Sequence, residues 1–467
     1  MDEKRVSLLS DKPVNENGDY VLYWMQMFKR PVWNHALNFA IRKANDLGLP
    51  LVVYEGLKYY YPWANDRLHT FILEGVNEKR EAFEKLGIRY LFYLQRNEGD
   101  PKQTVAGLAE RAAIVVTDDF PCFIIPGHND AIVAKTDVPV YTVDSNGVVP
   151  MACFEKEEYA AYTIRPKIHK LLPEFLTSFE EIEIDKNDSG LEVDCPDTVF
   201  DDEDIPELIA DCDIDHSVAP SPVYKGGRRA GLKRLRKFVS DILPGYHETR
   251  NKPEKDGSSR LSAYLHFGYL SSLEIALEVQ NAEAPDEAKE AYLEELIVRR
   301  ELSYNMTRFN PDYDSLDALH EWVQKTMREH ASDERSYNYS AEDLEQGNTH
   351  DELWNAIQRE LRETGEVHNY VRMLWGKNII AWTRSYEEAF SILEHLNNKY
   401  CLDGRNPNSY AGILWCFGKH DRPWMEREVF GKIRYMTSNS TGKKFRSKDY
   451  IEWTKRFENG GARTLFD

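Results

Sequence analysis

Short apolar runs alternate with amphipathic helical patterns over the first third of the chain, and this alternation restricts the fold more than any other feature of the sequence. The runs have the length and the β-branched and aromatic content of buried strands. They occupy residues 20–25, 49–54, 88–94, 113–119 and 138–143, with helical patterns at 34–47, at about 69–86 and from about 102. Strands and helices that alternate over short links predict an α/β domain with a mostly parallel sheet.

From residue 225 onward the patterns are helical only, so this part of the chain is predicted to be all-α. Serines mark helix starts at Ser271, Ser340 and Ser385. Residues 177–224 are strongly acidic and poor in aromatics, which is typical of a surface linker. Residues 226–239 form a basic amphipathic helix, whose charged side is either a solvated face or a rim that contacts phosphates.

The composition excludes several classes of protein. The net charge of −20 argues against a protein that coats nucleic acid non-specifically, but it allows a local basic groove. No GxGxxG follows the first strand and no GxxxxGK[ST] is present, so neither a dinucleotide fingerprint nor a P-loop is predicted. Six scattered cysteines without a CxxC pair indicate neither disulfides nor a metal site. The charged start and the lack of a long apolar run predict a cytoplasmic protein without membrane segments.

Tryptophans and arginines are unusually dense at residues 353–436. The tryptophans there are Trp354, Trp375, Trp382, Trp415 and Trp424. Trp375 and Trp382 are seven residues apart and share one face of a helix, with Arg372 one turn before Trp375. Core packing is one explanation. The other is a binding site for a planar, electron-rich or anionic guest, such as a flavin or a nucleobase.

A set of motifs closely resembles the class II cyclobutane pyrimidine dimer (CPD) photolyases of the photolyase/cryptochrome family. The motifs are YLHFG at 264–268, EELIVRREL at 294–302, LWNA at 353–356, RMLW at 372–375, LDGRNPN at 402–408, YAGILW at 410–415, HDRPW at 420–424 and GKIRYM at 431–436. The resemblance covers the chain after about residue 244 and is fainter before it. It implies three parts: a Rossmann-like antenna domain at 1–176, an acidic linker at 177–224, and an all-helical domain at 225–467 that binds FAD and the DNA lesion.

The resemblance also implies chromophores. The first domain would hold a light-harvesting pigment such as a deazaflavin or a folate, with an empty scaffold as the alternative. Residues 23–34 depart from the family pattern. The serine-rich segment at 256–262 resembles the one that grips the FAD diphosphate, and hydroxyls and free amides at a helix start suit an anion; plain N-capping is the alternative. The implied cofactor contacts are Tyr246, Ser259, Leu261, Ser262, Arg372, Asn397 and Asp403. Asn398 and Cys401 stand where relatives tend to have Asp and Glu.

The same resemblance implies an electron relay. Trp375 is expected beside the flavin, with Trp354 further out, Trp382 on a branch and Tyr339 near the end of the path. Core packing is the alternative for all four side chains.

The remaining matches concern the lesion and the DNA. Glu295 would hydrogen-bond the dimer, although its spacing from Arg299 alone predicts an exposed helix ion pair. Met373, Trp415 and Trp424 would form walls of the lesion pocket. Other residues would contact the DNA, with Arg250 and Asn251 filling the gap left by the flipped-out lesion; these residues are Arg250, Asn251, Arg299, Arg427 and Arg434.

The sequence therefore predicts a monomeric, FAD-dependent lyase that repairs CPD lesions in UV-damaged DNA under light, without a metal. A cryptochrome-like photoreceptor is the first alternative, and it would have no need of Glu295, Arg250 and Asn251 together. Repair of the (6-4) photoproduct requires a histidine in the pocket, and none of the matched positions is a histidine. A flavoprotein without a DNA role is the third alternative.

Overall fold

The computed structural model describes residues 3–102, 104–188 and 190–459 of the chain. Its first part is a six-stranded sheet with the strand order β1-β6-β5-β2-β3-β4. The strands are β1 (Val6–Ser10), β2 (Tyr20–Trp24), β3 (Leu51–Lys58), β4 (Arg89–Gln95), β5 (Ala112–Asp118) and β6 (Val140–Val143). β1 runs antiparallel to β6, and the other neighbours are parallel. The predicted α/β architecture is confirmed.

The edge strand β1 is not among the predicted strands. Leu8 and Leu9 on it are 48% and 39% exposed. An antiparallel edge strand with one open side does not need the continuous apolar run that marks a buried parallel strand. The prediction missed β1 for this reason.

Helices cover both faces of the sheet. They are α1 (His35–Leu47), α2 (Asp66–Leu73), α3 (Val76–Lys85), α4 (Val105–Ala109) and α5 (Ile125–Lys135). Alternate residues of β2 belong to two apolar clusters: Val21 and Tyr23 pack in a cluster with residues of α1 and α3, and Tyr20 and Leu22 in one with residues of α4 and α5. This alternation places one cluster on each face of the sheet.

The single helix predicted at 69–86 is two helices, α2 and α3, which are separated at Gly75. A Cβ atom at Gly75 would lie 2.6 Å from the ring of Tyr269. The Tyr269 phenol donates to the carbonyl oxygens of Phe71 (2.9 Å) and Ile72 (3.1 Å) at the end of α2. The last carbonyls of a helix lack intrahelical partners. A tyrosine from the second part of the chain therefore caps α2, and Gly75 leaves room for it.

The second part of the chain is helical, as predicted. Its helices, with two that precede it, are α6 (Ala161–Phe175), α7 (Ile205–Ala210), α8 (Arg228–Lys237), α9 (Tyr246–Thr249), α10 (Ser262–His266), α11 (Ser272–Asn281), α12 (Asp286–Leu293), α13 (Arg300–Phe309), α14 (Glu321–Glu329), α15 (Ala341–Gln346), α16 (Glu352–Thr364), α17 (Asn369–Trp382), α18 (Tyr386–Tyr400), α19 (Pro407–Cys416), α20 (Ser438–Thr441) and α21 (Ser447–Thr454). Phe238–Ile242 and Glu294–Arg299 are π-helical. The expected N-caps are confirmed, because the side chains of Ser271, Ser340 and Ser385 accept from the first turns of α11, α15 and α18.

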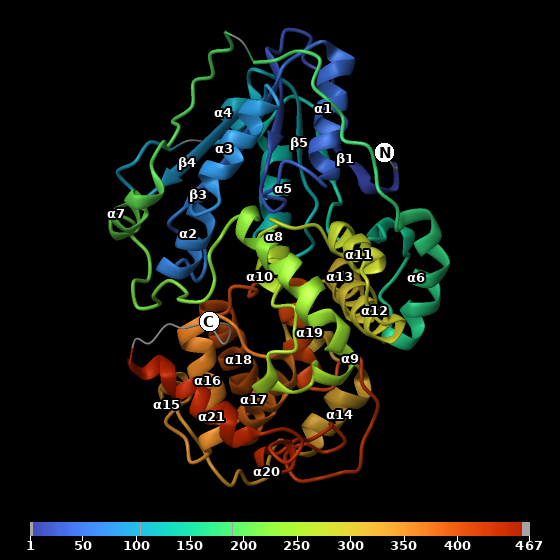
Figure 1. Ribbon diagram of the computed structural model, residues 1–467, viewed down its shortest axis with the longest axis vertical. Coiled ribbons are helices and arrows are strands. Elements are labelled where there is room, and N and C mark those ends of the chain that lie inside the picture. Colours follow the sequence, from blue (N-terminus) through green and yellow to red (C-terminus); the bar gives the residue numbers. More distant parts are fainter. Residues whose placement is uncertain (1–2, 103, 189, 460–467) are drawn as a thin grey trace.

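The acidic segment at 177–224 runs as an extended strap over the sheet part and includes the short helix α7 (Figure 1). Arg80 on α3 donates two hydrogen bonds of 2.8 Å to Asp197. The side chains of Asn38 and Asn45 on α1 donate to the backbone oxygens of Glu180 and Glu183 (both 2.9 Å). Polar side chains of the sheet's helices thus hold the strap in place.

The helical part packs against the carboxyl ends of the strands (Figure 1). Arg30, which follows β2, is 1% exposed and donates to the carbonyl oxygens of Gly268 (2.9 Å) and Ser145 (3.2 Å). Gly268 has φ +68°, and a Cβ atom there would lie 1.9 Å from the carbonyl oxygen of Met27. The two parts therefore meet backbone to backbone at this glycine.

A buried carboxyl group adds to the same interface. Glu301 on α13 accepts from the backbone N–H groups of Val148 (2.7 Å) and Val149 (3.1 Å). Burial, opposed in part by these bonds and by Arg300, raises the pKa of Glu301 from 4.5 to about 8. Its second oxygen is buried without a hydrogen-bond partner among the described residues.

No helix within the described ranges is both long enough and apolar enough to cross a membrane.

The interface predicts a pH-dependent stability. Because the folded-state pKa of Glu301 is raised, its contribution to stability is complete below pH 4.5 and is lost as the pH rises towards about 8. Glu301→Gln keeps an acceptor for both N–H groups and does not ionise. We expect wild type and Glu301→Gln to have similar melting temperatures at low pH, and the variant to be the more stable protein by pH 8. Wild type loses about 1.4 kcal/mol of folding free energy for each unit by which the pKa of Glu301 is raised. Thermal unfolding of both proteins as a function of pH measures this; parallel curves would contradict it.

Candidate functional site

Buried charges converge where α16, α17 and the segment at 256–262 meet. Arg260, whose side chain is 8% exposed, pairs with three carboxylates: Asp256 on its own segment, Glu366 (2.8 Å) before α17 and Glu360 (3.8 Å) on α16. The φ angle of Arg260 is +53°, in the left-handed region that favours glycine. The ion pairs thus hold a strained residue in place. Arg260 is not among the predicted site residues, since nothing about an arginine inside a serine-rich segment predicts burial.

The same segment carries the expected diphosphate residues. Arg234 on α8 donates to the backbone oxygens of Ser258 (2.9 Å) and Ser259 (2.8 Å). Ser259 shares a side-chain hydrogen bond with Tyr292, whose ring lies 5.3 Å from that of Tyr246. Leu261 is 1% exposed and precedes Ser262, the first residue of α10. The structure therefore brings Tyr246 and Ser259 together through Tyr292, which the sequence did not single out.

The expected Arg372–Asp403 pair is present. A terminal nitrogen of Arg372 lies 3.1 and 3.4 Å from the two carboxylate oxygens of Asp403. Burial alone would lower the pKa of Arg372, but Asp403 and its neighbours raise it above the ordinary value and keep the guanidinium charged. The Nε atom of Arg372 is buried and has no hydrogen-bond partner among the described residues. A fixed cation with one unpaired N–H fits an electron-rich ring with a carbonyl or nitrogen acceptor.

The last turn of α18 and the loop that follows it, residues 397–405, carry Asp403. Asn397 is 3% exposed and donates to the side-chain oxygen of Asn398 (3.2 Å), which also accepts from the backbone N–H of Arg405 (2.8 Å). Burial raises the pKa of the Cys401 thiol to about 12, so this position is uncharged. Asn398 thus shapes the loop, and Cys401 places a neutral group beside Arg372.

The expected relay residues form a contact path. Trp375 donates through its indole N–H to Gln358 (2.8 Å), and Trp354 donates to the backbone oxygen of Trp375 (3.0 Å). The rings of Trp354 and Trp382 lie 5.6 Å apart, and those of Trp382 and Tyr339 5.7 Å apart. Trp382 therefore lies in line between Trp354 and Tyr339, and not on a branch, because it ends α17 where the chain before α15 crosses it.

The predicted ion pair between Glu295 and Arg299 is wrong. Glu294–Arg299 is π-helical, and a π-helix brings residues five apart together. Arg299 accordingly pairs with Glu294 (3.2 Å). Glu295 instead pairs with Arg250 (3.0 Å). Two residues that are expected to act on the lesion thus form an ion pair with each other in this structure.

The residues expected to line the lesion pocket lie at different depths. The Arg299 guanidinium lies 5.7 Å from the ring of Trp415, and Met373 sulfur is 3.7 Å from that of Cys416. Trp424 is 42% exposed, with Arg434 at 5.1 Å from its ring.

Two expected DNA contacts also lie at the surface. Arg427 lies over Tyr435 at 4.3 Å, and Asn251 is exposed. In the loop between α19 and α20, cations and exposed rings thus lie together, as in nucleic-acid interfaces.

Three arginines of the basic helix α8 lie close to carboxylates of the protein itself. Arg228 pairs with Glu274, Arg229 with Glu81, and Arg234 lies 3.7 Å from Asp256. Arg229, Lys233 and Arg236 are the exposed residues of this helix. These pairs favour a structural role for most of the helix over a phosphate rim.

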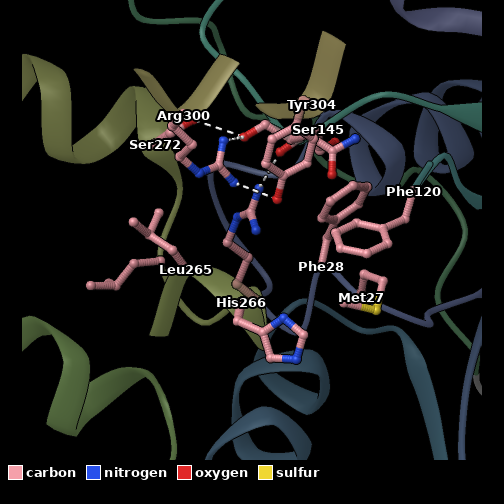
Figure 2. A pocket seen from close by; sticks show the side chains of 12 residues that line it. Met27, Phe28, Phe120, Ser145, Leu265, His266, Ser272, Arg300 and Tyr304 are labelled. Atoms are coloured by element: carbon pink, nitrogen blue, oxygen red, sulfur yellow. Dashed lines mark hydrogen bonds between the residues drawn. The ribbon is translucent and has the colours of Figure 1, made fainter. Parts of the chain in front are cut away.

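The strand ends, where an antenna pigment is expected, leave little space. A cavity of about 10 Å³ lies there, lined by residues that follow β2, β5 and β6, such as Phe28, Phe120 and Ser145. Figure 2 shows Arg300 donating to Tyr304 (2.9 Å) across it. Such a cavity holds about one water molecule. Within β3, Glu55 is fully buried between Lys29 and Lys79.

Across residues 3–102, 104–188 and 190–459, no group of three or more His, Cys, Asp or Glu side chains is arranged to hold a metal ion.

The chain is similar in sequence to known photolyases. The family model described as DNA photolyase matches residues 21–184. A deoxyribodipyrimidine photo-lyase of Methanothermobacter thermautotrophicus is 39% identical over 451 residues, which cover 96% of this chain and 97% of that protein. A deoxyribodipyrimidine photo-lyase of Potorous tridactylus is 37% identical and is covered to 83%, with 95% of this chain aligned.

Solved structures show the same fold at low identity. A cryptochrome of Synechocystis sp. PCC6803 superposes with a TM-score of 0.71 at 16% identity, over 96% of this chain and 92% of its own. An archaeal photolyase from Sulfolobus tokodaii, described with two FAD molecules, superposes with a TM-score of 0.67 at 16% identity, over 94% and 93%.

The buried charge cluster predicts a large stability effect. Arg260→Leu leaves Asp256, Glu360 and Glu366 without their cation, and removing one partner of a buried ion network costs about 3–5 kcal/mol. We expect urea unfolding, followed by circular dichroism, to show a loss of this size. Arg236→Ala removes an exposed arginine of α8 and is the matched control, with a change within about 0.5 kcal/mol. Equal stabilities of the two variants would contradict the role of Arg260.

Proposed function

The chain belongs to the photolyase/cryptochrome family, and we propose that it is a light-dependent lyase that splits cyclobutane pyrimidine dimers in DNA. The observation that carries this function is the 39% identity to a deoxyribodipyrimidine photo-lyase over nearly the full length of both chains. The fold alone is not sufficient, since a cryptochrome superposes as well as the photolyases do.

FAD is the cofactor that the family implies, and the described residues fit it. Arg372, with its unpaired Nε, and Asp403 would lie against the isoalloxazine, and the buried amide of Asn397 would face its N5 edge. Ser259 and Ser262 would hold the diphosphate beside Tyr246 and Leu261, on a segment that Arg234 and Arg260 fix in place. When bound and reduced, FAD supplies on absorbing light the electron that opens the cyclobutane ring.

Arg250 and Glu295 would carry out lesion recognition by separating. In the structure the carboxylate of Glu295 is occupied by Arg250 (3.0 Å). If Arg250 and Asn251 move into the gap that a flipped-out dimer leaves in the duplex, the guanidinium gains phosphate and base contacts and Glu295 is released. The released carboxylate can then accept a hydrogen bond from a thymine ring N–H. Met373, Trp415, Trp424 and Arg299 would surround the bases, and Arg427 and Arg434 would bind the DNA phosphates.

We further propose that the strand ends hold no antenna pigment. A deazaflavin or folate needs a pocket of at least about 300 Å³, and the cavity there is about 10 Å³. The ion triad of Lys29, Glu55 and Lys79 would also have to be broken to admit a ring system. For the strand ends, this proposal replaces the prediction of a deazaflavin or folate.

Repair under lamplight tests the proposed function. The chain is purified, loaded with FAD, reduced chemically and illuminated with UV-treated oligothymidylate. We expect recovery of thymine absorbance, with an action spectrum that follows reduced FAD alone. A protein that binds FAD but leaves dimers intact would favour the photoreceptor alternative, and a second band in the action spectrum would overturn the proposal about the antenna.

Variants of the Arg250–Glu295 ion pair test whether Arg250 acts in binding and Glu295 in catalysis. Arg250→Ala should weaken binding of dimer-containing DNA about tenfold, or about 1.4 kcal/mol, because the group that fills the duplex is lost. Glu295→Gln should bind within about fivefold of wild type, because a single hydrogen bond contributes about 1 kcal/mol or less in net terms, but should repair fewer dimers per absorbed photon.

Arg229→Ala removes the same charge as Arg250→Ala at a pair with Glu81 on the sheet side of the molecule, and it is the matched control. Fluorescence anisotropy measures affinity, and single-flash repair measures yield. Loss of the same property in Arg250→Ala and Glu295→Gln would contradict the division of roles.

A further inference from the structure

The aromatic path from the buried tryptophans ends at the surface in a cluster of two tyrosines and a histidine. Trp354 is fully buried and Trp382 is 7% exposed, whereas Tyr337 is 44% exposed. Around His350, the ring centroid of Trp382 lies at 5.1 Å and that of Tyr337 at 3.6 Å, nearly parallel to the imidazole. The cluster thus connects the buried rings with solvent.

Tyr339 and His350 are joined by two hydrogen bonds. The backbone N–H of His350 donates to the phenol oxygen of Tyr339 (3.0 Å). The phenol oxygen and Nδ1 of His350 lie 2.7 Å apart. Because the backbone N–H already points at the oxygen, the phenol O–H is directed at Nδ1, which in a neutral imidazole accepts. The distance is within the range in which a base takes a proton directly.

The backbone also fixes Tyr339 against the last tryptophan. The N–H of Tyr339 donates to the carbonyl oxygen of Trp382 (3.0 Å), and the two rings lie 5.7 Å apart in an edge-to-face arrangement. Tyr339 is therefore the phenol that an oxidised Trp382 meets at the surface end of the path.

Oxidation of a phenol differs from oxidation of an indole in its proton. An indole that loses one electron holds the positive charge, whereas a phenol that loses one electron becomes strongly acidic and gives up its proton. Electron loss from Tyr339 is more favourable where a base receives this proton in the same event. Among the described contacts of the phenol group, His350 Nδ1 is the base in position.

We propose that His350 is the proton acceptor that lets Tyr339 serve as the terminal electron donor during photoreduction of the flavin. This inference rests on the proposed function, in which the tryptophan path loses one electron to the light-excited flavin. Tyr339 then passes one electron to the oxidised Trp382 and its phenol proton to His350 Nδ1. The products are a neutral indole, a neutral tyrosyl radical and an imidazolium.

The cycle closes with an external thiol as reductant. The thiolate form of the thiol gives one electron to the tyrosyl radical and becomes a thiyl radical, and the imidazolium gives its proton back to the phenolate oxygen. Until then the electron vacancy resides on a neutral ring at the surface, separated from the flavin by Trp382, Trp354 and Trp375. His350 is exposed, so its Nε2 side can exchange protons with water.

Transient absorption of the FAD-loaded full chain tests the proposal. After a flash in the presence of a thiol, wild type should form a neutral tyrosyl radical, with slower formation in D₂O than in H₂O. His350→Asn keeps an acceptor near the Nδ1 position but is not a base. It should lose the tyrosyl signal, keep the tryptophan radical as the last oxidised species, and reduce its flavin several-fold less per absorbed photon.

Controls separate the base from the ring stack and from the function itself. Tyr337→Phe keeps the ring that stacks on His350 and should behave as wild type. Without any flavin, ¹⁵N-histidine NMR of the wild-type chain should show an unprotonated, hydrogen-bonded Nδ1 at His350, and this signal should shift in Tyr339→Phe. Chemically reduced His350→Asn and Tyr337→Phe should repair dimers as well as wild type.

The role of His350 and the proposed function are overturned by different results. An undiminished tyrosyl yield in His350→Asn, or an equal rate in D₂O and H₂O, would overturn the role of His350 while leaving the proposed function intact. Failure of chemically reduced wild type to repair dimers would overturn the proposed function.

Discussion

The buried guanidinium of Arg260 and its three carboxylates form the interaction on which the helical part depends. Removing charged groups from water costs several kcal/mol for each ion, and only close pairing repays that cost. The carboxylates come from three separate places: Asp256 precedes α10, Glu360 lies on α16 and Glu366 precedes α17. Closing this cluster therefore fixes the segment at 256–262 against the two helices that carry the tryptophan path and Arg372.

Buried polar side chains with hydrogen-bond partners also hold the two parts of the molecule together. The carboxyl ends of the parallel strands are where such sheets usually bind ligands. Here they are covered by polar contacts from the helical part, through Arg30 at Gly268 and Glu301 at Val148 and Val149. The sheet part thereby acts as a support for the helical part. The candidate site lies instead inside the helical part, at Arg372 and Asp403, where a cation is held with one donor unused.

Periodicity and turn chemistry predict much of this fold. The five buried strands, the helical second part and the serine caps all follow from local patterns, because burial on both faces or on one face of an element leaves a regular apolar spacing. The edge strand β1 and the break at Gly75 do not, since the first is half exposed and the second depends on Tyr269, nearly 200 residues away in sequence.

The candidate site, like the fold, has some features that the sequence predicts and others that depend on tertiary contacts. Arg372 with Asp403, and the choice of Trp354, Trp382 and Tyr339 as path residues, were within reach of motif resemblance, but the position of Trp382 in line between the other two was not. The partner of Glu295 was not, because a π-helical turn changes which side chains are neighbours. Arg260, Tyr292 and His350 act through tertiary contacts that no local pattern marks. A histidine directly before a helix N-cap is ordinary in sequence, and it becomes informative only when Tyr339 is seen at 2.7 Å from Nδ1.

The central claim is that the helical part, and not the strand ends, encloses the flavin. Amide hydrogen exchange of the chain with and without bound FAD tests this most directly. The account predicts that FAD slows exchange at residues 256–262, 366–375 and 397–405 and leaves the loops after β2, β5 and β6 unchanged. Protection confined to those three loops would contradict it.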